Sequence, residues 1–255
     1  MACKPYLMNR YAALIISLVF ILYFDHSSAQ DWLKTAEAKA AKRDTKIYHL
    51  TSIDGKNQTV KIVPDYANHV LKMICLKDII TIDDFWGETP DIRLLNKNFI
   101  EINYAVRGGS GVGLGNTLII CVEGQHLYKA MHVLRYLTGE SGEQQEEYRI
   151  KLHLVGNSIN NCKLKVSVHD FVDSKPRPKE NYAYDTNTVL AFDMQQNVFY
   201  SVKQDIFDHF ITTRNKTKQK IAGNFPMIIL GKETYYFIND RWYSGNLNKE
   251  MFEFR

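Results

Sequence analysis

EYRIKLHLVGNSINNCKLKVSV, residues 147–168, is the stretch that decides the fold class. In its first half, apolar Tyr148, Ile150 and Leu152 alternate with charged residues, and residues 162–168 repeat this alternation. A period of two is the mark of a strand with one buried face. The Gly-Asn-Ser-rich segment between the two halves is typical of a turn. We therefore predict an antiparallel hairpin with an apolar inner face and a cationic outer face.

Similar pairs of apolar runs, each separated by a short polar turn, recur along the chain. The expected hairpins join residues 46–53 to 59–63, 118–122 to 126–134, 188–194 to 198–202 and 226–230 to 234–238. The run 126–134 also fits a helix. Recurrent hairpins without a fixed repeat period predict a mainly β protein with a minor α contribution. We expect a sandwich- or barrel-like architecture, with an α+β arrangement as the alternative.

Other segments have less regular patterns. Residues 31–44 predict a short exposed helix capped by Asp31, and residues 204–213 suggest a second one. Residues 66–82 predict an irregular entry followed by a strand, residues 99–106 a strand with one buried face, and the segment from Gly139 a polar loop. We expect one β-rich domain over residues 30–255, with any subdomain seam in the proline-punctuated segment 173–186.

The first 29 residues have the features of a secretory signal peptide. Lys4 and Arg10 precede an apolar stretch over residues 12–24, and small residues end at Ala29. The apolar stretch is shorter than a membrane-spanning helix requires, and no second long apolar run follows. We predict cleavage after Ala29, a periplasmic or secreted protein, and no transmembrane segment in the mature chain.

The composition limits the class of partner. The chain has a formal net charge of +4, and residues 1–29 contribute a net +1 through Lys4, Arg10 and Asp25, which leaves about +3 on the mature chain. This charge is too small to indicate a nucleic-acid partner. Hydrophobic residues make up 45% of the chain, which is enough for a packed core and argues against disorder of the whole chain.

Three cysteines remain after cleavage. Cys75, Cys121 and Cys162 each lie in an apolar segment. An oxidising compartment permits one disulfide among them, but we expect each to be a small buried hydrophobic residue.

The glycine-rich segment 107–116 is the first candidate for a binding site. Gly109, Gly111, Gly113 and Gly115 recur at every second position, without the lysine of a phosphate-binding loop or the spacing of a dinucleotide fingerprint. We therefore expect a flexible or bulged connection between strands. Arg107 and Ser110 remain candidates for binding an anionic ligand through this loop.

The acidic segment 81–93 is the second candidate. Asp83, Asp84 and Glu88 surround Trp86, and carboxylates beside an aromatic ring are what a glycan-directed hydrolase uses. Adjacent Asp83 and Asp84 would point to opposite sides of a strand, so we favour a solvated turn with one core tryptophan over such a site. Trp242, in an aromatic C-terminal segment, is a further candidate for contact with a ligand.

No metal site or cofactor is predicted. The histidines are scattered, without a His-Glu-x-x-His motif, and no cysteine pair has a metal-ligand spacing. No complete catalytic motif is present, so an enzyme is the less favoured hypothesis. We expect an exported, non-catalytic binding or interaction protein with a protein or glycan partner in the cell envelope. The alternatives are a glycan hydrolase that uses Asp83, Asp84 and Glu88, or a structural component of an envelope assembly.

Overall fold

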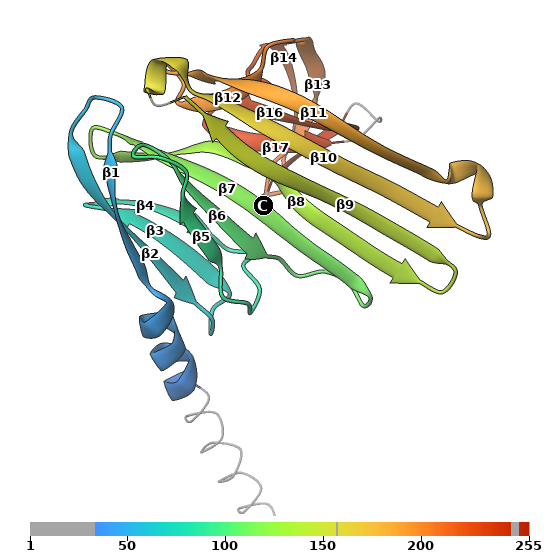
Figure 1. Cartoon of the computed structure of the whole chain (residues 1–255), viewed down its shortest axis with the longest axis horizontal. Coiled ribbons are helices and arrows are strands. Elements are labelled where there is room, and N and C mark those ends of the chain that lie inside the picture. The colour runs from blue at the N-terminus through green and yellow to red at the C-terminus, as the bar shows by residue number, and fades with distance from the viewer. Residues whose placement is uncertain (1–33, 157, 246–249, 255) are drawn as a thin grey trace, which may run out of the picture.

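The structure is a computed structural model that describes residues 34–156, 158–245 and 250–254. The predicted signal peptide lies outside these residues, as does the start of the first predicted helix. Within the described residues, one α-helix is present, at residues 34–44, and the rest is mainly β with largely antiparallel sheets (Figure 1). The predicted fold class is therefore confirmed.

The N-terminal sheet has four strands, each paired with the next along the chain. These strands are β1 (Lys46–Thr51), β2 (Asn57–Asp65), β3 (Val70–Cys75) and β4 (Asp78–Ile82). The predicted hairpin around Asp54 and Gly55 is the β1–β2 pair, in which Gly55 has a φ of 86°.

The central sheet has eight strands in consecutive antiparallel order, of which β9, β10 and β11 lie side by side in Figure 1. Its strands are β5 (Asp91–Leu94), β6 (Ile100–Ala105), β7 (Val112–Glu123), β8 (His126–Ser141), β9 (Gln144–Val155), β10 (Lys163–Ser174), β11 (Tyr182–Asp193) and β12 (Val198–Ser201). The predicted hairpin of residues 147–168 is the β9–β10 pair. The run 126–134 is part of strand β8 and not a helix.

The C-terminal sheet has six strands in the order β14-β13-β18-β17-β16-β15. Its strands are β13 (Ile206–Thr212), β14 (Lys218–Asn224), β15 (Met227–Leu230), β16 (Glu233–Ile238), β17 (Arg241–Gly245) and β18 (Glu250–Glu253). Strands β13 and β18 are parallel, so the last strand of the chain pairs with the first strand of this sheet.

Strand β7 is buried on both faces because each face meets a different sheet. Leu118 and Ile120 pack with the N-terminal sheet, in a cluster that includes Ile62 and Met73. The intervening Ile119 belongs to the other cluster, which includes residues of the C-terminal sheet. The central sheet is therefore sandwiched between the two smaller ones.

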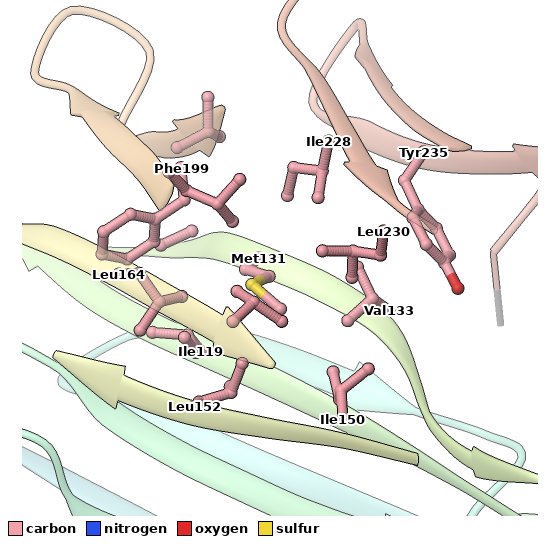
Figure 2. Packing of buried hydrophobic residues seen from close by; sticks show 14 of the residues in the cluster. Ile119, Met131, Val133, Ile150, Leu152, Leu164, Phe199, Ile228, Leu230 and Tyr235 are labelled. Carbon is pink, nitrogen blue, oxygen red and sulfur yellow. The ribbon is translucent and has the colours of Figure 1, made fainter. Parts of the chain in front are cut away.

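The larger hydrophobic cluster joins the central and C-terminal sheets (Figure 2). Met131 and Ile150 from the central sheet face Ile228 and Tyr235 from the C-terminal sheet. These four side chains are at most 5% exposed, and full burial of a large aliphatic side chain contributes about 1.5–3 kcal/mol. This packing holds the two sheets together.

The central sheet curls into a half-barrel. Strands β5 and β9 are separated by three strands in the sheet order, yet Arg93 Nη2 of β5 donates to the Leu152 carbonyl oxygen of β9 at 3.2 Å. Phe99, which precedes β6, has ring-centroid distances of 5.0 Å to Phe192 and 5.1 Å to Phe199. Contacts between strands so far apart in the order require a curled sheet.

Strands β8 and β9 separate along part of their length. Their pairing runs from Tyr136 and Arg149 to Ser141 and Gln144, and residues 126–134 of β8 pair with β7 alone. Side chains of the C-terminal sheet bond to this edge of β8: Trp242 Nε1 donates to the Lys129 carbonyl oxygen, and the Leu134 amide donates to Tyr235 Oη. The edge is therefore covered by a neighbouring sheet.

Three local predictions were wrong, and a fourth was half right. The strand expected at the end of residues 66–82 is β4, but the irregular entry expected before it contains strand β3, and the β3–β4 turn places exposed Leu76 at a φ of 53°. The helix expected over 204–213 is strand β13, and the loop expected from Gly139 is a tight β8–β9 turn at residues 142–143. Strand β6 is buried on both faces, including Glu101 and Asn103, instead of on one.

The segment 173–186 lies within the central sheet. It contains the end of β10, a short 3-10 helix, η2 (Pro178–Glu180), and the start of β11, and the two strands pair directly. A second 3-10 helix, η1 (Ile159–Asn161), lies in the β9–β10 connection.

Cys75, Cys121 and Cys162 are free, buried thiols, as expected of small hydrophobic residues. Burial is the main cause that raises the pKa of the Cys162 thiol to about 11 and that of Cys121 still further.

Candidate functional site

A cavity of about 240 Å³ lies where the C-terminal sheet covers the open edge of β8. We call it the junction cavity. It is lined by residues of β8, of the C-terminal strands and of their turns: Lys129, His132, Arg214, Asp240, Arg241, Trp242, Glu253 and Phe254. Small-molecule sites are concave and are lined mostly by apolar and aromatic side chains with a few polar groups, whereas six of the eight residues that line this cavity are ionisable.

The aromatic wall of the junction cavity is fixed in place. Trp242 is 2% exposed, and its Nε1 donates to the Lys129 carbonyl oxygen at 2.9 Å. The Phe254 ring meets the His132 ring edge-on, with centroids 4.7 Å apart. The candidate ligand residue Trp242 thus lies at the cavity, although most of its indole is packed in the core.

His132 contributes a neutral group to the junction cavity. Its Nε2 lies 2.6 Å from Tyr104 Oη, and both side chains are buried. Burial lowers the pKa of His132 well below its ordinary value, and the Lys129 and Arg214 cations lower it further. The imidazole is therefore uncharged at neutral pH and bonded to the tyrosine.

The two arginines of the cavity are held by carboxylates. Arg214 Nη1 lies 2.9 Å from both Asp83 carboxylate oxygens, and Arg214 Nε lies 3.3 Å from Glu253 Oε1. Arg241 Nη1 contacts both oxygens of Glu253 at 3.1 Å. This network joins the end of β4 to the β13–β14 turn and to β18, and it fixes the side chains at the cavity rim.

Lys129 also lines the junction cavity, but it takes no part in this network of ion pairs. It has no ion pair with any residue that the structure describes. Burial and, to a lesser degree, the Arg214 cation lower the pKa of Lys129 to about 8. Asp84, Asp83 and Glu253 act in the opposite direction without offsetting this.

The three carboxylates of the predicted acidic site do not lie in one common environment. Asp83 is exposed and paired with Arg214, while half-buried Asp84 raises the pKa of Tyr104 and of Lys129 through its charge. Glu88 is exposed and acts instead on Tyr136, whose pKa is raised mainly by burial. Two of the three carboxylates thus contribute to the electrostatics of the junction cavity.

Trp86 and Arg107 come together, but away from the cavity lining. The Trp86 indole is 40% exposed, and the His69 ring stacks on it with centroids 4.4 Å apart. The Arg107 guanidinium carbon lies over the same indole at 5.1 Å from its centroid. A sugar ring would compete with these side chains for the indole.

The glycine-rich segment forms the β6–β7 turn and the start of β7. Gly111 has a φ of 76°, and the register of β7 shifts between Gly115 and Asn116. A Cβ atom on Gly115 would overlap with the Tyr136 ring. These glycines make room for a turn and for an aromatic side chain on the neighbouring strand. Ser110 is exposed in the turn.

Reasoning from the sequence missed Lys129, His132, Tyr104 and Arg214 as members of one site. The available signal was the pair Lys129 and His132 within the run HLYKAMHVL, where both interrupt an otherwise apolar strand. Their partners come from distant segments, since Asp83 and Arg214 are 131 positions apart. No local motif could reveal that proximity.

Two further observations concern the described residues as a whole. None of the helices in this part of the chain is long and apolar enough to cross a membrane. Nor do three His, Cys, Asp or Glu side chains gather there in an arrangement that could hold a metal ion.

Comparisons with known proteins give no family. No protein-family model, no curated protein and no solved structure matches this chain. The chain is therefore described by its structure alone. It is a mainly β protein of three sheets, with a mixed-charge cavity between two of them.

Proposed function

We propose that this protein is an exported, non-catalytic binding protein whose junction cavity takes a small organic molecule with an acidic group. The proposal rests chiefly on Lys129, a partly buried cation at the wall of a cavity. It has no ion pair among the described residues. A desolvated charge is costly unless it is paired, so a ligand anion would supply the missing partner.

The charges around Lys129 favour an anion. Arg214 is the largest electrostatic influence on Lys129, and it repels the ammonium group. Asp83 and Glu253 are already bonded to arginines, which limits what they contribute to Lys129. Asp84 attracts the ammonium group, but less strongly than Arg214 repels it. A carboxylate or phosphate between Lys129 and Arg214 would relieve the repulsion and raise the pKa of Lys129.

The size of the cavity limits the ligand. A volume of 240 Å³ corresponds to roughly eight water molecules at about 30 Å³ each. This space suits a small organic acid, and the Trp242 and Phe254 rings offer contacts to its apolar part.

Binding without catalysis is supported by the way the polar groups are held. The two guanidinium groups are bonded to carboxylates, and the neutral imidazole of His132 is bonded to Tyr104. Groups fixed by internal partners are suited to recognising a ligand. Export is supported by the sequence of residues 1–29, with Lys4 and Arg10 ahead of the apolar stretch.

Thermal unfolding tests the binding site. The purified protein is heated with phosphate, acetate or benzoate, against sodium chloride of equal ionic strength. A ligand at one hundred times its dissociation constant adds about 2.7 kcal/mol of stability. We expect one of these anions to stabilise the wild type but not Lys129→Met, while Lys203→Met, at an exposed position, responds like the wild type. Equal responses of wild type and Lys129→Met, or no response to any of the three anions, would contradict the proposal.

Mass spectrometry tests export. The full-length chain is expressed in bacterial cells, and the extracytoplasmic fraction is collected. We expect a protein that begins at Gln30, because cleavage after Ala29 removes the signal peptide. Recovery of the intact chain from the cytoplasm alone would count against export.

A further inference from the structure

The exposed face of β9 and β10 carries a cluster of cations that do not line the junction cavity. Arg149, Lys151 and His153 on β9 are exposed, as are Lys163 and Lys165 on β10. We call these five residues the outer face. The residues between them, including Ile150 and Leu164, are buried in the cluster that meets the C-terminal sheet. The alternation therefore places the cations on the side of the strands away from that core.

The strand register brings these cations close together. Lys165 is paired with His153 across the two strands, and Lys163, two residues earlier on β10, is paired with Val155. On β9, Arg149 and Lys151 are likewise two residues apart. Successive outward residues on a strand are about 6.6 Å apart, and neighbouring strands about 4.8 Å. The outer face is therefore a flat, elongated group of positive charges that extends over about 20 Å.

Most of this charge is not neutralised within the protein. Arg149 Nε is paired with Glu147 at 2.6 Å. Lys151, Lys163 and Lys165, by contrast, have no ion pair with any residue in the described part of the chain. Three like charges held side by side on a rigid sheet repel one another, and a polyanion would relieve this repulsion.

Two shallow hollows lie at the end of the outer face that contains Arg149 and Lys151. One, of about 440 Å³, is lined by Arg135, Tyr136, Thr138, Arg149, Ile150 and Lys151, without a carboxylate. The other, of about 360 Å³, shares Arg149 and Lys151 and adds Ser167 and Asn187. It also contains the carboxylates of Glu147 and Asp185, which are paired with Arg149 and His169. Because the hollows share residues, they form one continuous surface that runs across β8, β9, β10 and β11.

We propose that the outer face binds an acidic polysaccharide, one whose sugar units carry carboxylate or sulfate groups. The cations meet the acidic groups, and the Tyr136 ring in the first hollow suits a contact with a sugar ring. Ser167 and Asn187 hydrogen-bond to each other at 2.7 Å in the second hollow and can bond to sugar hydroxyls. The mixture of cations with hydroxyl, amide and aromatic groups favours a charged saccharide over other polyanions. This site is independent of the ligand proposed for the junction cavity.

Binding assays with two matched triple variants test this proposal. The outer-face variant is Lys151→Gln, Lys163→Gln and Lys165→Gln. The control is Lys42→Gln, Lys77→Gln and Lys203→Gln, which removes the same charge from exposed positions elsewhere. The probes are polygalacturonate and dextran sulfate, with uncharged dextran, single-stranded DNA and phosphatidylglycerol vesicles for comparison. Thermal unfolding of both variants checks that they fold.

We expect the wild type to bind one of the two acidic polysaccharides more tightly than DNA or vesicles, and not to bind uncharged dextran. The outer-face variant should bind that polysaccharide about tenfold more weakly, from three lost charge contacts, and the control like the wild type. An equal loss in both variants would show a general charge effect and overturn the proposal. Tighter binding of DNA or vesicles, or no binding of either acidic polysaccharide, would also overturn it.

Discussion

The Trp242 indole donates a hydrogen bond to the Lys129 carbonyl oxygen across 113 positions of sequence, at 2.9 Å. This bond joins β17 to the edge of β8 that β9 does not pair with, and it also sets one wall of the junction cavity. The same contact thus holds two sheets together and positions the backbone from which the Lys129 side chain extends.

Replacing Trp242 with phenylalanine should destabilise the protein. The change removes the donor and leaves the Lys129 carbonyl oxygen without this partner, at a cost of about 1–3 kcal/mol. Urea unfolding measures the difference. Trp86→Phe, at a 40% exposed position, serves as the control and should change the unfolding free energy by less. If both variants unfold at the wild-type midpoint, the bond does not stabilise the junction.

Gly115→Ala should destabilise the protein because its Cβ would overlap with the Tyr136 ring. Overpacking of this kind costs about 1–3 kcal/mol. The same substitution in a Tyr136→Ala background should cost much less, since the ring is gone, and this coupling can be measured by a double-mutant cycle. Gly109→Ala, where a Cβ meets nothing within 4 Å, is the matched control. A neutral Gly115→Ala would show that the glycine is not needed for this packing.

The Lys129 ammonium should make stability rise with pH in alkaline solution. Its pKa is lowered to about 8 in the folded protein, against an ordinary value of 10.5, so between these values the unfolded chain binds more protons. Deprotonation therefore favours the folded state in this window. The measurement is the difference in unfolding free energy between wild type and Lys129→Met from pH 7.5 to 10, because subtraction removes the titration of other groups. A difference that stays constant with pH would contradict the lowered pKa.

His132 should make the stability of the protein fall as the solution becomes acidic. Its folded-state pKa lies well below the ordinary 6.5, so as the pH falls below 6.5 the unfolded chain takes up a proton that the folded protein excludes. Stability is lost over that range. Unfolding of His132→Phe between pH 7 and pH 5 should show a weaker loss than the wild type. His209→Phe, at a half-buried position outside the cavity lining, should retain the wild-type loss.

Local sequence pattern predicted much of the fold. Alternation over residues 147–168 correctly identified the β9–β10 hairpin and its cationic outer face, because side chains on a strand alternate whatever the strand pairs with. Glycine-containing turns marked the β1–β2, β7–β8 and β15–β16 hairpins. The pattern failed at Leu76, which occupies a left-handed turn position without the usual glycine or asparagine, and at residues 206–212, where pairing with β14 and β18 overrides a helix-compatible pattern.

The candidate site was predicted only in pieces. Asp83, Asp84 and Trp242 were singled out for their chemistry, and the structure places Asp83 on an arginine of the junction cavity and Trp242 in its wall. Their partners, Lys129 and Arg214, could not be found in this way because no local pattern relates them.

The sequence by itself determined the most regular hairpins, such as β9–β10, and which side of their strands is apolar, because these properties follow from neighbouring residues and from the two-residue period of a strand. Only the tertiary structure decided that the central sheet is covered on both faces, that β8 and β9 separate, and that a cavity with Lys129 lies at the opening. These features depend on which sheet packs against which. That choice is made by contacts between residues more than a hundred positions apart, such as Trp242 with Lys129 and Asp83 with Arg214.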